Sequence, residues 1–125
     1  MDVKFARLTV YHNADVVRRL AIKRNLKGNI TIGRKGHGSI IDLPFSYISR
    51  QHAEIVVLEG EQLLLRDLGS KSGTFVNGER VLETELNDKD EIRFSTLSDS
   101  YRIKVEYLSP QEPDYEPSTV KAQAV

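Results

Sequence analysis

Basic and hydroxyl-bearing residues stand at three points of this chain where an apolar stretch ends. Arg34 follows Gly33, Ser49 precedes Arg50, and residues 67–78 (DLGSKSGTFVNG) supply a lysine, several hydroxyls and glycines that expose backbone amides. A guanidinium group, hydroxyl donors and free N–H groups are the groups that bind a phosphate. If the fold brings the three points together, they form an anion-binding pocket.

The segments that must position these residues have the pattern of short strands. Ala6, Leu8 and Val10 alternate with polar neighbours, as in a half-buried strand, and Asn77-Gly78 predicts a tight hairpin. No window indicates a long amphipathic helix. Strands are expected over residues 6–10, 16–22, 29–32, 40–43, 52–58, 62–66, 74–76, 79–82, 90–94 and 101–107. Many short strands at this spacing predict an all-β sandwich or barrel, whose loops gather at its two ends.

Other chemistries have little support in the sequence. His52 opens an apolar strand and is expected to be a buried structural histidine, because one His without partners makes no metal site. Ser49 lies close to it, but a third triad member and a nucleophile elbow are missing. The glycines of residues 69–73 do not form a phosphate-binding P-loop, since the GxxxxGK[ST] pattern is absent. We therefore expect no enzyme activity, no metal and no cofactor.

Composition narrows the class of protein further. The 125 residues suit one domain, and 18 basic residues balance 18 acidic ones, so the chain lacks the basic excess typical of nucleic-acid binding. The absence of Cys excludes disulfides. No apolar run is long enough to be a signal peptide or to cross a membrane. We expect a cytoplasmic protein, or a nuclear one in a eukaryote, with no nucleic-acid or membrane partner.

Taken together, the three points resemble the forkhead-associated (FHA) domain family. That family carries Gly-Arg, then Ser-x-x-His, then a loop ending in Asn-Gly-Thr and a following Asn-Gly. The matching segments here are Gly33-Arg34, Ser49-Arg50-Gln51-His52, Ser72-Gly73-Thr74 and Asn77-Gly78. The resemblance covers about residues 3–107. It implies an eleven-stranded antiparallel β-sandwich with a phosphothreonine-peptide site at one loop end, in a domain of residues 1–108. Residues 109–125, which hold three of the four prolines, are expected to be a disordered tail or linker.

The resemblance also implies a role for each matching residue. Phosphopeptide contacts fall to Arg34, Ser49, Arg50, Lys71, Ser72 and Asn77. Structural support of the site falls to Gly33, His52, Gly73 and Thr74. The departure is Ser72, because the family usually has an Asn there that reaches the main chain of the bound peptide, and a Ser offers one hydroxyl on a shorter arm. Residues 35–39 and Ser46-Tyr47 are candidates for reading the residues that flank the phosphothreonine.

The expected function is therefore non-catalytic recognition of phosphothreonine peptides, as an adaptor that recruits partners modified by an upstream Ser/Thr kinase. An alternative is an FHA-fold interaction domain that acts without phosphate, by self-association, through a sheet face or the loop at residues 95–100. A further alternative is regulatory, because Thr119, once phosphorylated, would make the domain's own tail a ligand.

Overall fold

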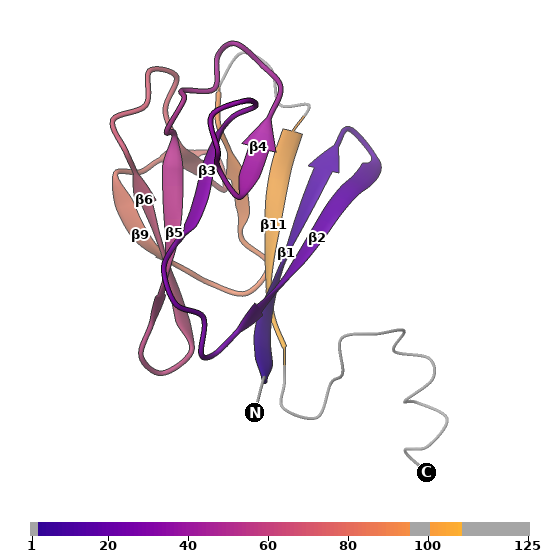
Figure 1. The fold of residues 1–125 in the computed structure, drawn as a ribbon, viewed down its shortest axis with the longest axis vertical. Helices are drawn as coiled ribbons and strands as arrows, with labels where there is room; N and C mark the ends of the chain where they lie inside the picture. Colours follow the sequence, from indigo (N-terminus) through magenta and orange to yellow (C-terminus); the bar gives the residue numbers. More distant parts are fainter. Residues whose placement is uncertain (1–2, 96–100, 109–125) are drawn as a thin grey trace.

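The computed structural model describes residues 3–95 and 101–108, and every regular element in them is a strand. Figure 1 shows the strands arranged as two facing sheets, which confirms the predicted all-β sandwich and its eleven strands. The strands are β1 (Lys4–His12), β2 (Asp15–Lys23), β3 (Ile30–Arg34), β4 (Ile41–Leu43), β5 (Ala53–Leu58), β6 (Gln62–Asp67), β7 (Phe75–Val76), β8 (Glu79–Arg80), β9 (Glu83–Leu86), β10 (Glu91–Arg93) and β11 (Tyr101–Tyr107).

The two sheets differ in size. One has six strands in the order β2-β1-β11-β10-β7-β8, and the other has five in the order β4-β3-β5-β6-β9. The recorded pairings are antiparallel except for β3 with β4, which run parallel with Ile32 opposite Ile41. The expectation of an antiparallel sandwich therefore needs this one correction. The parallel pair matters for the site because it places Arg34 at the end of β3 beside Leu43 of β4.

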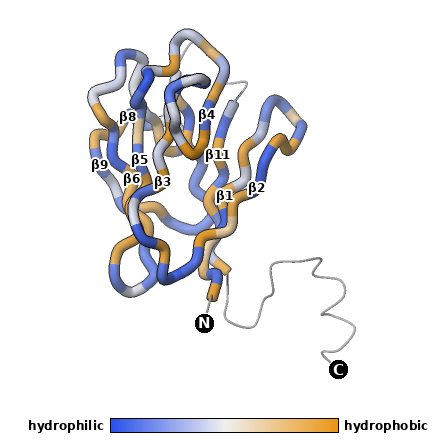
Figure 2. The backbone as a smooth tube through the Cα atoms, in the orientation of Figure 1, coloured by the Kyte–Doolittle hydropathy of each residue, from blue (hydrophilic) through white to orange (hydrophobic). Residues whose placement is uncertain are grey.

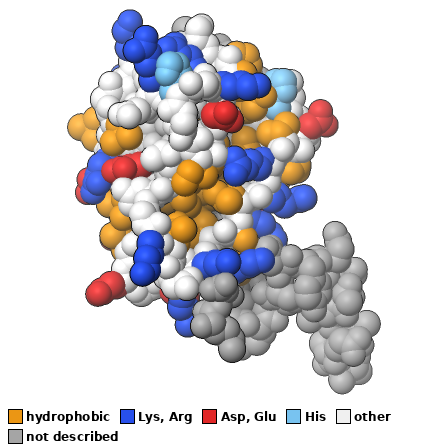
Figure 3. All heavy atoms as spheres, viewed as in Figure 1, with side chains coloured by type: hydrophobic (Ala, Val, Ile, Leu, Met, Phe, Trp, Pro, Cys, Tyr) orange, Lys and Arg blue, Asp and Glu red, His pale blue; other side chains and the backbone are white. Residues whose placement is uncertain are grey.

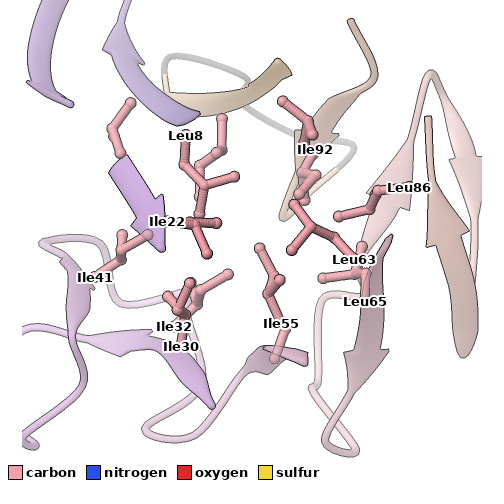
Figure 4. Packing of buried hydrophobic residues seen from close by; sticks show 14 of the residues in the cluster. Leu8, Ile22, Ile30, Ile32, Ile41, Ile55, Leu63, Leu65, Leu86 and Ile92 are labelled. Atoms are coloured by element: carbon pink, nitrogen blue, oxygen red, sulfur yellow. The ribbon is translucent and has the colours of Figure 1, made fainter. Parts of the chain in front are cut away.

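A single apolar core fills the space between the sheets. Figure 4 shows Leu8, Ile22 and Ile92 of the six-stranded sheet facing side chains of the five-stranded sheet such as Ile55 and Leu63. Hydrophobic and hydrophilic residues alternate along the strands (Figure 2), because successive side chains of a strand point to opposite faces of the sheet. Each fully buried aliphatic side chain contributes about 1.5–3 kcal/mol relative to its exposed state. Burial of these side chains stabilises the packing of the two sheets, and the packed sheets fix the positions of the strand ends from which the loops emerge.

Strand β9 was not predicted from the sequence pattern. Its residues are Glu83, Thr84, Glu85 and Leu86, and only Leu86 is buried. The strand lies at the edge of its sheet, paired with β6 alone, so it needs little apolar surface and shows a weak pattern. The predicted Asn77-Gly78 hairpin is confirmed: it joins β7 to β8, with φ angles of 50° and 89° that suit a tight two-residue turn.

The loops of interest lie at one end of the sandwich. The connections after β3, β4 and β6 emerge at the upper end in Figure 1, and the N-terminus lies at the lower end. At that lower end the amide of Leu108 donates to the carbonyl of Phe5, at 2.7 Å, so both ends of the described chain are neighbours. The predicted tail of residues 109–125, its Thr119, and most of the loop at residues 95–100 lie outside the described residues. The described residues contain no helix that is long and apolar enough to cross a membrane.

Tyr107 joins the two sheets near the end of β11. Its hydroxyl donates to the carbonyl of Leu86 at 2.7 Å and accepts from the amide of Leu63 at 3.0 Å. The phenol comes from the six-stranded sheet, and both partners belong to the five-stranded sheet. Burial raises the pKa of Tyr107, so the hydroxyl stays protonated and keeps its role as a donor.

We predict that Tyr107→Phe lowers the free energy of unfolding by about 1–3 kcal/mol, because it leaves the amide of Leu63 without its acceptor, while the carbonyl of Leu86 keeps the hydrogen bond from Nε2 of Gln62. Urea unfolding followed by circular dichroism measures this change. Tyr11→Phe is the control, since the ring of Tyr11 contacts Arg102 and its hydroxyl has no recorded hydrogen bond among the described residues. Equal stability of the two variants would contradict the proposed role of the Tyr107 hydroxyl.

Candidate anion-binding pocket

Three stretches far apart in sequence line one open pocket at the loop end. Its volume is about 540 Å³, and its lining residues are Arg34, Ser46, Tyr47, Ile48, Ser49, Arg50, Lys71 and Ser72. Three of these eight side chains are cationic and none is acidic. Lys and Arg side chains also gather at the upper end of the molecule in Figure 3. The pocket is therefore suited to an anion.

Arg34 is fixed by the backbone on both of its sides. Its amide donates to the carbonyl of Ser49 at 3.0 Å, and the next amide, of Lys35, donates to the carbonyl of Leu43 at 2.9 Å. Its guanidinium Nη1 makes one long contact, 3.4 Å, to the carbonyl of Ser46. No carboxylate in the described part of the chain pairs with Arg34, so its other N–H donors remain available to a ligand.

Gly33 allows the second loop, residues 44–52 between β4 and β5, to lie close to β3. A Cβ atom added at Gly33 would lie 2.1 Å from the carbonyl oxygen of Arg50 and 2.5 Å from Oγ of Ser39. The first contact is with backbone, which cannot move aside without displacing the loop. Glycine at this position is thus what lets the segment carrying Ser49 lie against β3.

The third loop, residues 68–74 between β6 and β7, orients the hydroxyl of Ser49. Its Oγ accepts from the amide of Lys71 at 3.1 Å, which leaves the hydroxyl proton free to donate to a ligand. Its own amide donates to Nδ1 of His52 at 3.1 Å. Ser49 is therefore held by residues from two different segments, both of which border the pocket.

His52 is fully buried, as predicted, with a relative exposure of 0%. Because Nδ1 accepts from the Ser49 amide, the ring proton must be on Nε2, which then donates to the carbonyl of Gly73 at 2.8 Å. The ring also meets Phe94 edge to face, with centroids 5.2 Å apart. A neutral imidazole thus joins the second loop to the third.

Burial lowers the pKa of His52, and this effect outweighs the hydrogen bond to Gly73 and the negative charge of Asp67, both of which raise it. The neutral form is also the one that the hydrogen bonds require. Protonation would place a second N–H against the amide of Ser49. The link between the two loops is therefore specific to the neutral ring.

Asp67 organises the third loop, and the sequence analysis gave it no role. Its Oδ2 accepts from the amides of Gly69 and Ser70, at 2.9 and 3.0 Å, and its Oδ1 accepts from the hydroxyls of Ser70 and Thr74, at 2.5 and 2.6 Å. Oγ of Ser70 in turn accepts from the amide of Gly73. An Asp followed two residues later by Gly and then Ser is a turn-forming pattern that would have indicated this arrangement.

The four hydrogen bonds also fix the charge state of Asp67. Burial alone would raise its pKa, but the bonds from Ser70, Thr74 and the amide of Gly69 outweigh burial and hold the pKa below its usual range. The carboxylate therefore stays ionised to a lower pH than an ordinary Asp does. Its contribution to stability is present above about pH 3.9 and is lost as the pH falls through its lowered pKa.

Ser72 lines the pocket, but its hydroxyl is directed at the protein itself. Its Oγ lies 2.8 Å from the carbonyl of Tyr47 and 2.6 Å from the carbonyl of Phe94. A hydroxyl has one proton, and two carbonyls of this protein already compete for it. The predicted contact of Ser72 with a peptide therefore has no free donor in this arrangement.

Asn77 is not among the residues that line the pocket. Its carboxamide donates to Oδ1 of Asp90 at 2.8 Å and accepts from the amide of Glu91 at 3.0 Å. These bonds hold the β7–β8 hairpin against β10. The structure thus gives Asn77 a supporting position outside the pocket lining, and its contact with a peptide stays a prediction.

The other predicted residues are found at or beside the pocket. Arg50 and Lys71 are exposed at its rim, and Thr74 is fully buried beneath it. Of the candidates for flanking contacts, Ser46 and Tyr47 line the pocket and residues 35–39 do not. Ile48, also in the lining, was not predicted.

Within residues 3–95 and 101–108, no group of three His, Asp or Glu side chains is placed to hold a metal ion.

Comparison with known proteins places these features in a family. Residues 30–95, more than half of the chain, match the FHA domain family. FhaA of Mycobacterium tuberculosis, an FHA domain-containing protein, is 43% identical over 67 residues, which are 54% of this chain and 12% of FhaA. The chain thus aligns with a small part of that relative's length.

Solved structures give the same result. The FHA domain of FhaA, in its crystal structure with the intracellular domain of Rv3910, is 32% identical with a TM-score of 0.65, over 81% of this chain and 99% of that one. A structure from an analysis of phosphothreonine-dependent FHA domain interactions is 30% identical with a TM-score of 0.68, over 84% and 98% of the two chains.

We predict that the protein loses stability as the pH falls below about 6.5. In that range the unfolded chain binds a proton at His52 that the folded protein excludes, at a cost of at most about 1.4 kcal/mol per pH unit. Urea unfolding at pH 7.5, 6.5, 5.5 and 5.0 measures the change. His37→Gln, in an exposed loop, should keep this pH dependence, and His52→Gln should lose it at a lower stability. A wild-type stability that does not change between pH 7.5 and 5.0 would contradict the prediction.

Proposed function

The chain belongs to the forkhead-associated (FHA) domain family, and on this premise we propose that it is a non-catalytic module that binds phosphothreonine-containing peptides. The observation that carries the proposal is the pair Arg34 and Ser49. Hydrogen bonds fix the main chain at Arg34 and the hydroxyl of Ser49, and both side chains keep donors free at the same pocket wall.

The chemistry of the wall suits a phosphate monoester. A phosphate group carries about −1.5 to −2 charges at pH 7 and three acceptor oxygens. Arg34 supplies a planar guanidinium, which pairs with two phosphate oxygens at once, and the hydroxyl of Ser49 donates to a third. Arg50 and Lys71 add positive charge at the rim. The hydroxyl of Ser49 is already oriented by the amide of Lys71 before binding, so ordering this donor costs little.

One relative supports a phosphorylated partner, and a second supports a protein partner. One solved FHA structure comes from a study of phosphothreonine-dependent interactions, and the FhaA domain was crystallised with the intracellular domain of another protein. For this chain we propose the same class of ligand, a phosphothreonine-containing protein produced by an upstream Ser/Thr kinase. Residues 1–108 would form the binding domain and residues 109–125 a linker, in an adaptor that acts in the cytoplasm or nucleus.

The test uses a degenerate phosphothreonine-peptide library to select a ligand, followed by titration of that peptide with and without its phosphate. We expect binding to require the phosphate. Arg34→Ala should weaken it by tenfold or more, because a hydrogen bond to a charged group contributes about 1.5–3 kcal/mol. Lys27→Ala is the control, since it removes one charge from the turn between β2 and β3, at the opposite end of the sandwich.

Equal binding of the two peptides, or normal binding by Arg34→Ala, would contradict the proposal. Concentration-dependent association without any phosphopeptide, measured by light scattering, would instead favour the alternative of an FHA-fold domain that associates independently of phosphate. The inward hydroxyl of Ser72 is the observation behind that alternative.

A further inference from the structure

Positive charge at the loop end is not neutralised by the protein. The recorded ion pairs lie on the sheets and their turns: Arg7–Glu106, Arg24–Glu61, Arg66–Glu54, Arg66–Glu83, Arg93–Glu91 and Arg102–Glu91. Across residues 3–95 and 101–108, none of them includes Arg34, Arg50, Lys71 or Arg80. Four cations therefore stand at or beside the pocket without a carboxylate partner.

Arg80 is the member of this group that the phosphate site does not use. It is the last residue of β8 and pairs with Phe75 of β7. A Cβ atom added at Gly73 would lie 3.0 Å from Nε and 3.2 Å from Cζ of Arg80. The guanidinium thus occupies the space where residue 73 would have a side chain, directly beside Ser72, which lines the pocket. Arg80 itself is exposed.

The charges exceed what one phosphate needs. A single phosphate monoester brings at most about two negative charges, and Arg34, Arg50 and Lys71 alone carry three positive ones. Arg80 adds a fourth. A ligand with only one phosphate would leave cations at this end that repel each other. A second anionic group on the ligand would neutralise them.

Ser72 gives an independent reason to look for a second contact. Its hydroxyl is shared between the carbonyls of Tyr47 and Phe94, so the side chain of residue 72 has no free donor for the peptide main chain. The phosphate must then be supplemented by another interaction if the peptide is to be held in one register. Beside Gly73, the residue that follows Ser72, lies the guanidinium of Arg80, a donor group that is not part of the pocket lining.

We propose that this site selects peptides that carry a second anionic group close to the phosphothreonine, and that Arg80 binds that group across Gly73. This inference rests on the proposed phosphopeptide function. Adjacent residues of an extended chain advance about 3.3 Å, so anions placed up to three residues from the phosphothreonine cover about 10 Å on either side of it. The group is either a second phosphate or the carboxylate of Asp or Glu, and both are planar or tripodal oxygen acceptors that a guanidinium recognises.

Three phosphothreonine peptides of one sequence test the proposal by fluorescence anisotropy. One has neutral flanks, one has Glu at the flanking positions within three residues, and one has phosphothreonine there instead. We expect Glu to tighten binding about two- to fivefold and the second phosphate about tenfold, with both gains reduced at raised salt. Arg80→Gln should remove the gains and leave the affinity for the neutral-flank peptide within about twofold. Lys27→Gln, which removes one charge at the opposite end, should keep them.

The outcomes separate this inference from the function on which it rests. Equal affinity for the three peptides would overturn the selection of a second anion while leaving phosphothreonine binding in place. Equal loss of the gains in Arg80→Gln and Lys27→Gln would overturn the assignment to Arg80 and indicate a general effect of net charge. Failure of every phosphopeptide to bind better than its unphosphorylated form would overturn the proposed function itself. The exposure of Arg80 makes its variant compatible with folding, which a matching thermal unfolding curve confirms.

Discussion

The binding end of this protein depends on one neutral, buried imidazole. His52 accepts from the amide of Ser49 and donates to the carbonyl of Gly73, so a single ring sets the spacing between two loops that are distant in sequence. Asp67 does the same within the third loop by accepting four hydrogen bonds. Neither group is among the residues that line the pocket. Because His52 is fully buried, a lost hydrogen bond there is costly, and the two loops that it joins are therefore held in fixed positions.

The strands were largely predictable because their burial follows a period of two. Ala6, Leu8 and Val10 of β1 are buried as that pattern predicts, and the Asn77-Gly78 turn needed only local geometry. What could not be predicted arises from non-local pairing. Strand β9 is an edge strand that buries one side chain, and the parallel alignment of β3 with β4 depends on a register that no local pattern encodes.

In the site, too, features set by local sequence were predictable and features set by contacts between distant segments were not. The motif pattern indicated Arg34, Ser49 and His52 because glycine, serine and histidine at those spacings fit backbone contacts that recur in the family. The directions of Ser72 and Asn77 were not predictable, because they are set by Tyr47, Phe94, Asp90 and Glu91, whose proximity exists only in the folded chain. Sequence reasoning thus identified which residues border the pocket better than it identified where their polar atoms point.

The hydrogen bond between Leu108 and Phe5 brings the two ends of the described chain together, on the side of the sandwich away from the pocket. A domain whose ends leave side by side can be placed within another polypeptide, at a surface turn, with a small entropic cost of loop closure. Its ligand-binding end then points outward from whatever carries it. This geometry would allow the domain to be inserted into another protein without blocking the pocket, because the pocket and the points of covalent attachment lie at opposite ends of the sandwich.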